Sequence, residues 1–233
     1  MQRKKIVVLT GAGVSAESGL STFRDAGGLW EGHDVHEVAS PQGFANDPEL
    51  VLRFYNLRRR QLEDVKPNEA HFAIASLEKK YDVVIVTQNV DNLHERAGST
   101  NIIHLHGELT QAKSVLPPYN VYDIGYKDIE LGDLCEKGGQ LRPNIVWFGE
   151  AVPLMTEAAM VAGSADIFIV VGTSLVVYPA AGLIDYVSAK TPKYIIDPNK
   201  PIVNDFHKNI NFITEKATKG MVALADKLLN EIN

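Results

Sequence analysis

Short runs of consecutive apolar residues recur along the chain, and each has the length of a β-strand. The runs cover residues 5–9, 83–87, 102–105, 167–171 and 193–196, and residues 212–213 predict a short last strand. Strands that are apolar along their whole length are typical of a sheet covered on both faces. The chain is therefore expected to contain a central sheet with a layer of helices on either side.

Segments with the periodicity of helices lie between these runs. They cover residues 48–62, 68–81, 92–97, 156–164, 180–189 and 219–231. Because strands and helices alternate, the predicted class is α/β, with a Rossmann-like parallel sheet and helices on both faces.

The spacing of the first two strands predicts an additional domain. About 60 residues separate them, whereas a plain βαβ unit takes roughly 30, and residues 107–142 form a second irregular stretch. Two insertions are expected to build a smaller domain over the carboxyl ends of the strands. The large lobe would cover about 1–24, 75–106 and 143–233, and the small lobe about 25–74 and 107–142.

Composition narrows the class of protein. A hydrophobic content of 45% with 22% charged residues is ordinary for a globular protein. The 23 basic and 29 acidic residues give a net charge of −6, which indicates neither a nucleic-acid partner nor an anionic membrane. The apolar runs are too short for a membrane span or a signal peptide. We expect a cytoplasmic protein that acts as a monomer.

The first strand leads into a glycine-rich turn. Gly11, Gly13 and the residues up to Ala16 fit the G-x-G-x-x-[GA] fingerprint, which lets a backbone approach a pyrophosphate at a helix N-terminus. Alone this is a weak signal, because a turn that binds nothing has the same sequence. A dehydrogenase would also place an acid at the end of a second strand, and Glu31 follows no predicted strand. Hydride transfer is therefore disfavoured.

Polar side chains follow the other predicted strands. They are Gln88, Asn89 and Asp91 after one strand, His104 and His106 after the next, and Thr173 and Ser174 after Gly172. Parallel strands place such residues at one edge, where open α/β sheets bind ligands. Each turn alone is typical of a capped loop. With the glycine turn after the first strand there are four such turns at successive strand ends, and together they predict a site.

Together these motifs resemble those of the sirtuins, the NAD-dependent protein lysine deacylases. The matching stretches are GAGVSAESGLSTFRDAGGLW, TQNVDNLHERAG, HLHG, LRPNIVWFGE and GTSLVVYPAAGL, spread between residues 10 and 183. The chain is most similar to the bacterial CobB type. The resemblance implies that NAD is consumed as a co-substrate, with release of nicotinamide and transfer of the acyl group of a modified lysine to ADP-ribose.

The resemblance also implies roles for single residues. His106 is the implied general base, with His104 as the competing candidate, and Asn89 and Asp91 belong to the pocket for the ribose and the carboxamide. Phe23 would shield the reactive carbon from water. The implied NAD contacts are Gly11, Ala12, Gly13, Ser15, Phe23, Arg24, Gln88, Gly172, Thr173, Ser174 and Asp197. Asp197 stands where the family usually has asparagine, so it can accept but not donate a hydrogen bond.

The implied partner is an acylated lysine side chain of a protein. The segment that contains Val146, Phe148 and Gly149 matches one of the two stretches between which the family clamps substrate backbone as an added strand. Val146 and Phe148 would line the tunnel for the lysine stem. Such pairing reads main chain more than side chains, so modest sequence selectivity is expected.

A Y-x-x-R pair on the predicted helix 48–62 is similar to that of the desuccinylating sirtuins. Tyr55 and Arg58 are three residues apart and share a face, and a phenol with a guanidinium suits the carboxylate of an acidic acyl chain. Ala39 would leave room for that chain. On spacing alone, a solvated basic face that includes Arg59 and Arg60 is the competing interpretation.

The chain departs from the family at the zinc site. Most sirtuins hold a structural zinc with two C-x-x-C pairs, but Cys135 is the single cysteine here, so no structural zinc is expected. The stretch is rich in apolar and aromatic residues, which predicts that packing replaces the metal. These residues are Val115, Leu116, Tyr119, Val121, Tyr122, Ile124, Tyr126, Ile129, Leu131 and Leu134.

Two further functions use the same motifs. A protein mono-ADP-ribosyltransferase would attack the same activated carbon of NAD. A catalytically silent NAD-binding or ADP-ribose-binding regulator would need the pocket alone. The presence of Asn89, Asp91 and His106 together disfavours the regulator, because a protein that only binds has no need of a general base.

Overall fold

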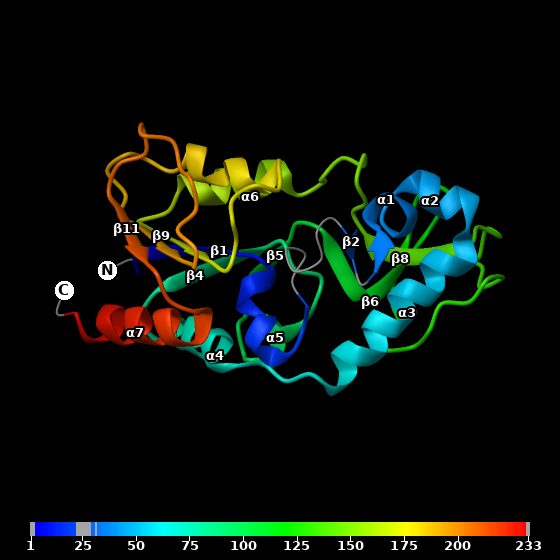
Figure 1. The fold of residues 1–233 in the computed structure, drawn as a ribbon, viewed down its shortest axis with the longest axis horizontal. Coiled ribbons are helices and arrows are strands. Elements are labelled where there is room, and N and C mark those ends of the chain that lie inside the picture. The colour runs from blue at the N-terminus through cyan, green and yellow to red at the C-terminus, as the bar shows by residue number, and fades with distance from the viewer. Residues whose placement is uncertain (1–2, 22–28, 31, 232–233) are drawn as a thin grey trace.

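A six-stranded parallel sheet forms the centre of the molecule (Figure 1). The structure, a computed structural model, describes residues 3–21, 29–30 and 32–231. The strand order is β11-β10-β9-β1-β4-β5. The strands are β1 (Lys5–Thr10), β4 (Asp82–Thr87), β5 (Ile102–His104), β9 (Ile167–Val171), β10 (Lys193–Ile196) and β11 (Ile210–Ile213). All six predicted strands are present, and β1 lies between β4 and β9.

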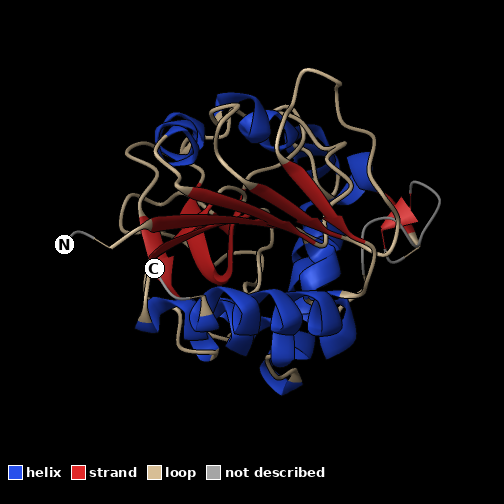
Figure 2. Cartoon of the chain, turned by 90° about the vertical axis from the view of Figure 1, so that its left-hand side faces the viewer, coloured by secondary structure: helices blue, strands red, loops and turns tan. Residues whose placement is uncertain are grey.

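Helices cover both faces of this sheet (Figure 2). Ile6 and Val8 pack against the side of α4 and α7, whereas Val7 and Leu9 pack against the side of α6 and η4. The covering elements are α4 (Glu69–Ser76) with η3 (Leu77–Lys79), α7 (Ala217–Asn230), α6 (Met155–Gly163) and η4 (Ala180–Tyr186). Because both faces of β1 are buried, its residues 6–9 are all apolar, and the predicted α/β class is confirmed.

The predicted helix at 180–189 is a short 3-10 helix instead. A segment this short that contains Gly182 gains little from α-helical hydrogen bonds, since glycine is a poor helix former and helix nucleation is costly. None of the described helices combines the length and the apolar character that crossing a bilayer requires.

A second, antiparallel sheet of three strands lies beyond the carboxyl ends of the large one (Figure 1). Its central strand β6 (Gly107–Ser114) pairs with β7 (Val121–Asp123) and β8 (Leu141–Ile145). The long helix α3 (Pro48–Asp64) packs against β6 and β8. The remaining elements are β2 (Leu29–Trp30), β3 (His33–Asp34), α1 (Val35–Val38), α2 (Pro41–Asn46) and α5 (Leu93–Arg96).

The prediction that apolar packing replaces the metal is largely wrong. Ile129 is buried, and Ile124 and Tyr126 are partly packed against the core. The exposed members of the set are Val115, Leu116, Tyr119, Val121, Leu131 and Leu134. Five of the six lie in the loops before and after β7, and Val121 lies on β7, an edge strand of the small sheet. Polar contacts hold the segment: the Asn56 side chain donates to the carbonyl of Ile129 at 2.9 Å and accepts from its amide at 3.0 Å.

Candidate active site

Two glycine turns, one after β1 and one after β9, pack directly on each other. The amide of Gly11 donates to the Val171 carbonyl at 3.1 Å, and the amide of Gly13 donates to the Gly172 carbonyl at 2.9 Å. A Cβ on Gly13 would lie 2.7 Å from the Gly172 Cα. Gly172 has a φ of 63°, and a Cβ there would lie 2.3 Å from the Val14 nitrogen. Contact between the turns therefore requires these glycines.

The segment after β1 is not the α-helix N-terminus that the fingerprint predicts. It forms two 3-10 helices, η1 (Ala12–Val14) and η2 (Ala16–Ser18), and Gly19 in the left-handed conformation ends the second. Because the amides of Gly11 and Gly13 already donate to protein carbonyls, an anion at this turn would need other donors. The polar side chains around the turn are therefore the more informative groups.

Ser15 joins the β1 turn to the loop after β4. Its hydroxyl donates to Asp91 Oδ2 at 3.0 Å and accepts from Asn89 Nδ2 at 3.2 Å, and His71 Nε2 lies 3.4 Å away. All four residues are buried. Burial raises the pKa of Asp91, while hydrogen bonds from the Leu93 amide and from Ser15 oppose the rise. We call Ser15, Asn89 and Asp91 the serine hub.

Gln88 connects the β4 loop to the turn after β9. Its side-chain amide donates to Thr173 Oγ1 at 3.3 Å, and its backbone amide donates to the Thr10 carbonyl at 3.0 Å. Thr173 Oγ1 also lies 3.3 Å from the Leu175 amide, which donates to it. Ser174, half-buried, follows on the same turn. Polar side chains thus join the turns after the adjacent strands β9, β1 and β4. We call Gln88, Thr173, Ser174 and the serine hub the polar wall.

His106 follows β5, and its tautomer is set by a backbone group. Nδ1 lies 2.9 Å from the carbonyl oxygen of Gln88, which can only accept, so Nδ1 carries the proton and Nε2 the lone pair. Burial lowers the pKa of His106, and the bond to Gln88 opposes the shift. The ring is therefore neutral near pH 7, which is the form that can take up a proton.

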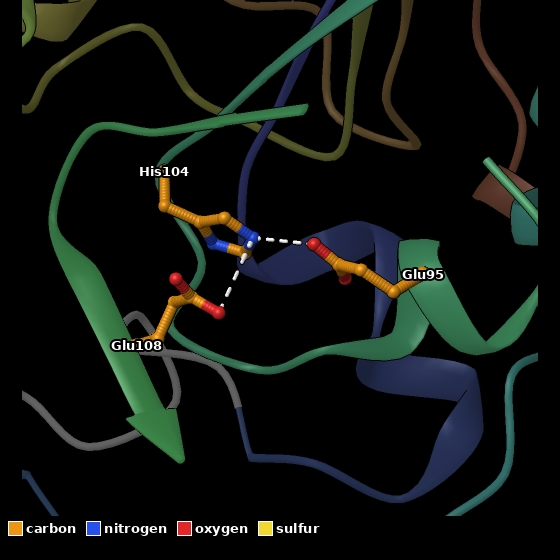
Figure 3. A group of neighbouring side chains, drawn as sticks. All are labelled: Glu95, His104 and Glu108. Atoms are coloured by element: carbon orange, nitrogen blue, oxygen red, sulfur yellow. Dashed lines mark hydrogen bonds and ion pairs between the residues drawn. The ribbon is translucent and has the colours of Figure 1, made fainter. Parts of the chain in front are cut away.

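His104 lies two residues earlier in a different environment (Figure 3). Its Nε2 lies 2.6 Å from Glu95 Oε1 on α5 and 4.0 Å from Glu108 Oε2 on β6. Burial lowers the pKa of His104, but the hydrogen bond to Glu95 and the two carboxylate charges outweigh it, so the net shift is upward. The raised pKa favours the protonated ring, and its Nε2 is already engaged by Glu95, so His104 is the weaker candidate for the general base. The three side chains could also hold a metal ion, although their ion pairs account for the arrangement.

The segment after β8 is tied to both neighbouring elements. The amide of Val146 donates to the His106 carbonyl, and the amide of Phe148 donates to the Ala39 carbonyl, each at 2.9 Å. Val146 is half-buried, whereas Phe148 and Gly149 are exposed. A peptide strand added along this segment would have to pair with its other backbone groups.

Tyr55 and Arg58 lie on α3, as predicted. Tyr55 is fully buried, and its hydroxyl accepts a hydrogen bond from Trp147 Nε1 at 3.1 Å. Burial raises the pKa of Tyr55 far above its ordinary value, and the Trp147 bond and the charge of Arg58 act in the opposite direction. Arg58 is half-buried with its guanidinium 5.7 Å from the centre of the Phe54 ring. Ala39 is buried nearby in the same hydrophobic cluster as Tyr55.

The alternative of a solvated basic face is wrong, because the neighbouring arginines have different environments. Arg59 is fully buried, where Nε donates to the Leu109 carbonyl at 2.6 Å and Nη1 donates to Asn56 Oδ1 at 2.7 Å. Burial lowers the pKa of Arg59 to about 10. Arg60 is exposed and pairs with Asp128.

Asp197 is the remaining implied NAD contact among the described residues. Asp197 follows β10, is buried, and accepts from the Asn199 amide at 2.9 Å. Phe23 and Arg24, with the turn at 25–28, lie outside the described residues.

Two side chains of the site were missed by sequence reasoning. Trp147 contacts Tyr55 across 92 positions, and His71 reaches Ser15 across 56. His71 offered one signal, a histidine on the helix that follows Asn68, where it completes a capping box. No local pattern marks Trp147, because its partner lies on a different element.

Known proteins resemble this chain over nearly its whole length. The Sir2 family model matches residues 11–179. The NAD-dependent protein deacylase of Bacteroides thetaiotaomicron is 52% identical over 231 residues, covering 97% of this chain and 98% of that protein. A mutant Sir2 homologue in complex with ADP-ribose superposes with a TM-score of 0.88 at 39% identity, covering 99% and 96% of the two chains.

A third match includes a peptide. It is a Sir2 protein with a deacetylated p53 peptide and 3'-O-acetyl ADP-ribose, with a TM-score of 0.82 at 30% identity and coverage of 97% and 94%. Both the sequence and the fold therefore agree with the resemblance that the motifs suggested. The chain belongs to the Sir2 family.

Proposed function

We infer that this chain is an NAD-dependent protein deacylase that removes acyl groups from lysine side chains. The observation that carries the inference is the meeting of the serine hub with His106 at the carboxyl ends of β1, β4 and β5. The Bacteroides relative is named for this activity. The two Sir2 structures contain ADP-ribose and 3'-O-acetyl ADP-ribose, respectively. The net charge of −6 supports a protein partner over a nucleic acid.

The polar wall fits NAD as co-substrate. Its donors and acceptors come from three adjacent strand ends, and the buried amide of Asn89 and carboxylate of Asp91 suit a ribose and a carboxamide. The residues that would hold it are Ala12, Ser15, Gln88, Asn89, Asp91, Thr173, Ser174 and Asp197, with Gly11, Gly13 and Gly172 shaping the turns and Phe23 and Arg24 closing over the ribose. When bound, NAD supplies a ribose carbon whose nicotinamide can leave.

His106 is the proposed general base. The Gln88 carbonyl fixes the proton on Nδ1, so Nε2 is the atom that accepts a proton from a ribose hydroxyl. Ser15 fixes the orientation of the Asn89 amide and the Asp91 carboxylate by hydrogen bonds to both. Catalysis then depends on groups that are oriented before the substrates arrive.

Acetyl-lysine and acidic acyl-lysines, with succinyl-lysine and malonyl-lysine as the acidic class, are the proposed substrates. Tyr55 and Arg58 lie on one face of α3, and the charge of Arg58 acts on the Tyr55 hydroxyl. Arginine binds a carboxylate through two parallel hydrogen bonds. Val146, Phe148 and Gly149 would receive the peptide, and Ala39 would leave space beside the acyl chain.

The test is nicotinamide release and lysine deacylation on matched acetyl-lysine and succinyl-lysine peptides. We expect Arg58→Met to lose succinyl activity and keep acetyl activity, and His106→Ala to lose both while still binding NAD. Arg60→Met is the matched control, because Arg60 is exposed and pairs outside the site. A native protein that binds NAD but performs neither reaction would be a regulator, and labelled ADP-ribose left on protein would indicate a mono-ADP-ribosyltransferase.

A further inference from the structure

Trp147 is the direct hydrogen-bond donor to the proposed acyl-binding tyrosine. Its indole Nε1 donates to Tyr55 Oη at 3.1 Å, and both side chains are buried, at 2% and 0% exposure. A buried indole N–H needs an acceptor, and a phenol that accepts one bond keeps its own proton as a donor. The bond therefore fixes the direction in which the Tyr55 hydroxyl can donate.

An ion pair also fixes the position of Trp147. The Arg142 guanidinium lies over the indole with its Cζ 3.2 Å from the ring centre. The same guanidinium donates twice to Glu150, at 2.7 and 3.0 Å. Glu150 also accepts from the backbone amide of Trp147 at 2.8 Å. One bidentate pair thus fixes both the ring and the backbone of Trp147.

The position of Trp147 links this pair to the substrate-binding segment. The flanking residues Val146 and Phe148 donate their amides to the carbonyls of His106 and Ala39. The ring itself packs beside Phe44 at 5.3 Å. A shift of the indole would therefore move the Tyr55 hydroxyl while the flanking backbone stays tied to the active site.

We propose that Trp147 is a positioning residue for acyl selection: it orients the Tyr55 hydroxyl toward the terminal carboxylate of an acidic acyl chain. This rests on the proposed activity on such chains. The Arg142–Glu150 pair sets the position of the indole, so acyl preference depends on residues that do not touch the acyl group. An acetyl group has no carboxylate, and its turnover does not use the bond.

The test is Trp147→Phe, which keeps an aromatic ring under Arg142 but removes the N–H together with the pyrrole part of the indole. We expect KM for a succinyl-lysine peptide to rise about fivefold, in keeping with the loss of one hydrogen bond. Its kcat, and both constants for the acetyl-lysine peptide, should stay within about twofold. Phe44→Leu is the packing control, since it removes the contact between the Phe44 and Trp147 rings and keeps the hydrogen bond to Tyr55.

A double-mutant cycle separates positioning from general damage. In a Tyr55→Phe background the hydroxyl is absent, so adding Trp147→Phe should have no further effect on the succinyl KM. An equal rise in KM for both peptides, or full additivity with Tyr55→Phe, would overturn the proposal. If the native protein lacks succinyl activity, the acidic-acyl proposal fails and this one fails with it.

A spectroscopic measurement covers the case in which Trp147→Phe does not fold. The chain has two tryptophans, so nitrogen-labelled indoles give two N–H resonances. We expect one resonance to move when a succinyl-lysine peptide is added and to respond much less to an acetyl-lysine peptide. Tyr55→Phe should shift that resonance and remove its response. Equal responses to both peptides in the native protein would contradict the proposal.

Discussion

Two buried neutral histidines lie beside the serine hub, and they should make the protein unstable in acid. The rings of His71 and His94 are 4.9 Å apart, and both residues are at most 1% exposed. His71 Nδ1 accepts from the Asn68 amide at 3.3 Å, which caps α4. His94 Nε2 lies 3.1 Å from Thr10 Oγ1, and its Nδ1 is buried with no hydrogen-bond partner in the described part of the chain.

Protonation is unfavourable at both rings. Burial lowers the pKa of His71 to about 4, with the charge of Glu95 opposing the shift. Burial also lowers the pKa of His94 well below its ordinary value, and the charges of His71 and His104 add to the effect. A proton on His71 Nδ1 would break the capping bond, and one on His94 Nδ1 would have no acceptor.

The sign and size of the pH effect follow from linkage. The lowered pKa values mean that the folded state binds fewer protons than the unfolded state, whose histidines titrate near 6.5. The contribution of these two histidines to stability should be constant above about pH 7 and fall below it. Below about pH 6.5, each histidine lowers the free energy of unfolding by about 1.4 kcal/mol per pH unit. At pH 5 the two together therefore lower it by about 4 kcal/mol. That is a large share of a typical stability of about 5 to 15 kcal/mol.

Urea unfolding at pH 7.5 and pH 5.0 measures this difference. We expect the loss in His94→Gln to be about 2 kcal/mol smaller than that of the native protein, because one titrating group is removed and the side-chain amide can still reach Thr10. His36→Gln is the control, since His36 is exposed, and its loss should match the native one. The raised pKa of His104 acts in the opposite direction in all three proteins and cancels. Equal losses in His94→Gln and in the native protein would refute the argument.

Three further outcomes follow from the geometry. Gly172→Ala should lower the melting temperature by several degrees and weaken NAD binding, because its Cβ would lie 2.3 Å from the Val14 nitrogen. The control Gly163→Ala should change neither quantity, because the nearest atom to its Cβ would lie at 3.5 Å. Arg59→Met should cost about 2 to 4 kcal/mol in urea unfolding, since the buried Leu109 carbonyl and Asn56 Oδ1 each lose a charged donor, and Arg60→Met should cost under 1 kcal/mol. Elemental analysis of chelator-treated protein should find no stoichiometric zinc, and one zinc per chain would contradict our interpretation of the insertion.

The large sheet could be predicted because its strands carry their own signal. The central strands β1, β4 and β9 are buried on both faces, so most of their residues are apolar in succession, and parallel pairing brings the following polar residues to one edge. That reasoning found Gln88, Asn89, Asp91 and His106 without any contact information. It could not choose the base, because the Gln88 carbonyl at His106 and Glu95 at His104 are set by packing.

The environments of α3 could not be predicted, because the sequence LRRRQ is uniform while its surroundings are not. Arg59 is buried only because the Leu109 carbonyl and Asn56 provide acceptors in the interior. The apolar residues after β6 misled in the opposite direction, since composition cannot show that most of them lie in exposed loops around the edge strand β7. In both cases the deciding partner lies on another element.

The glycine fingerprint by itself does not establish what this fold binds. Gly13 and Gly172 are needed because the turns after β1 and β9 approach each other too closely for a Cβ, and that need would exist with no dinucleotide present. Ser15 is different, because the contact between the turns does not require a hydroxyl there. It lies two residues beyond Gly13, where it bonds to both Asn89 and Asp91. The side chains gathered by that hydroxyl, rather than the glycines, therefore carry the argument for NAD chemistry.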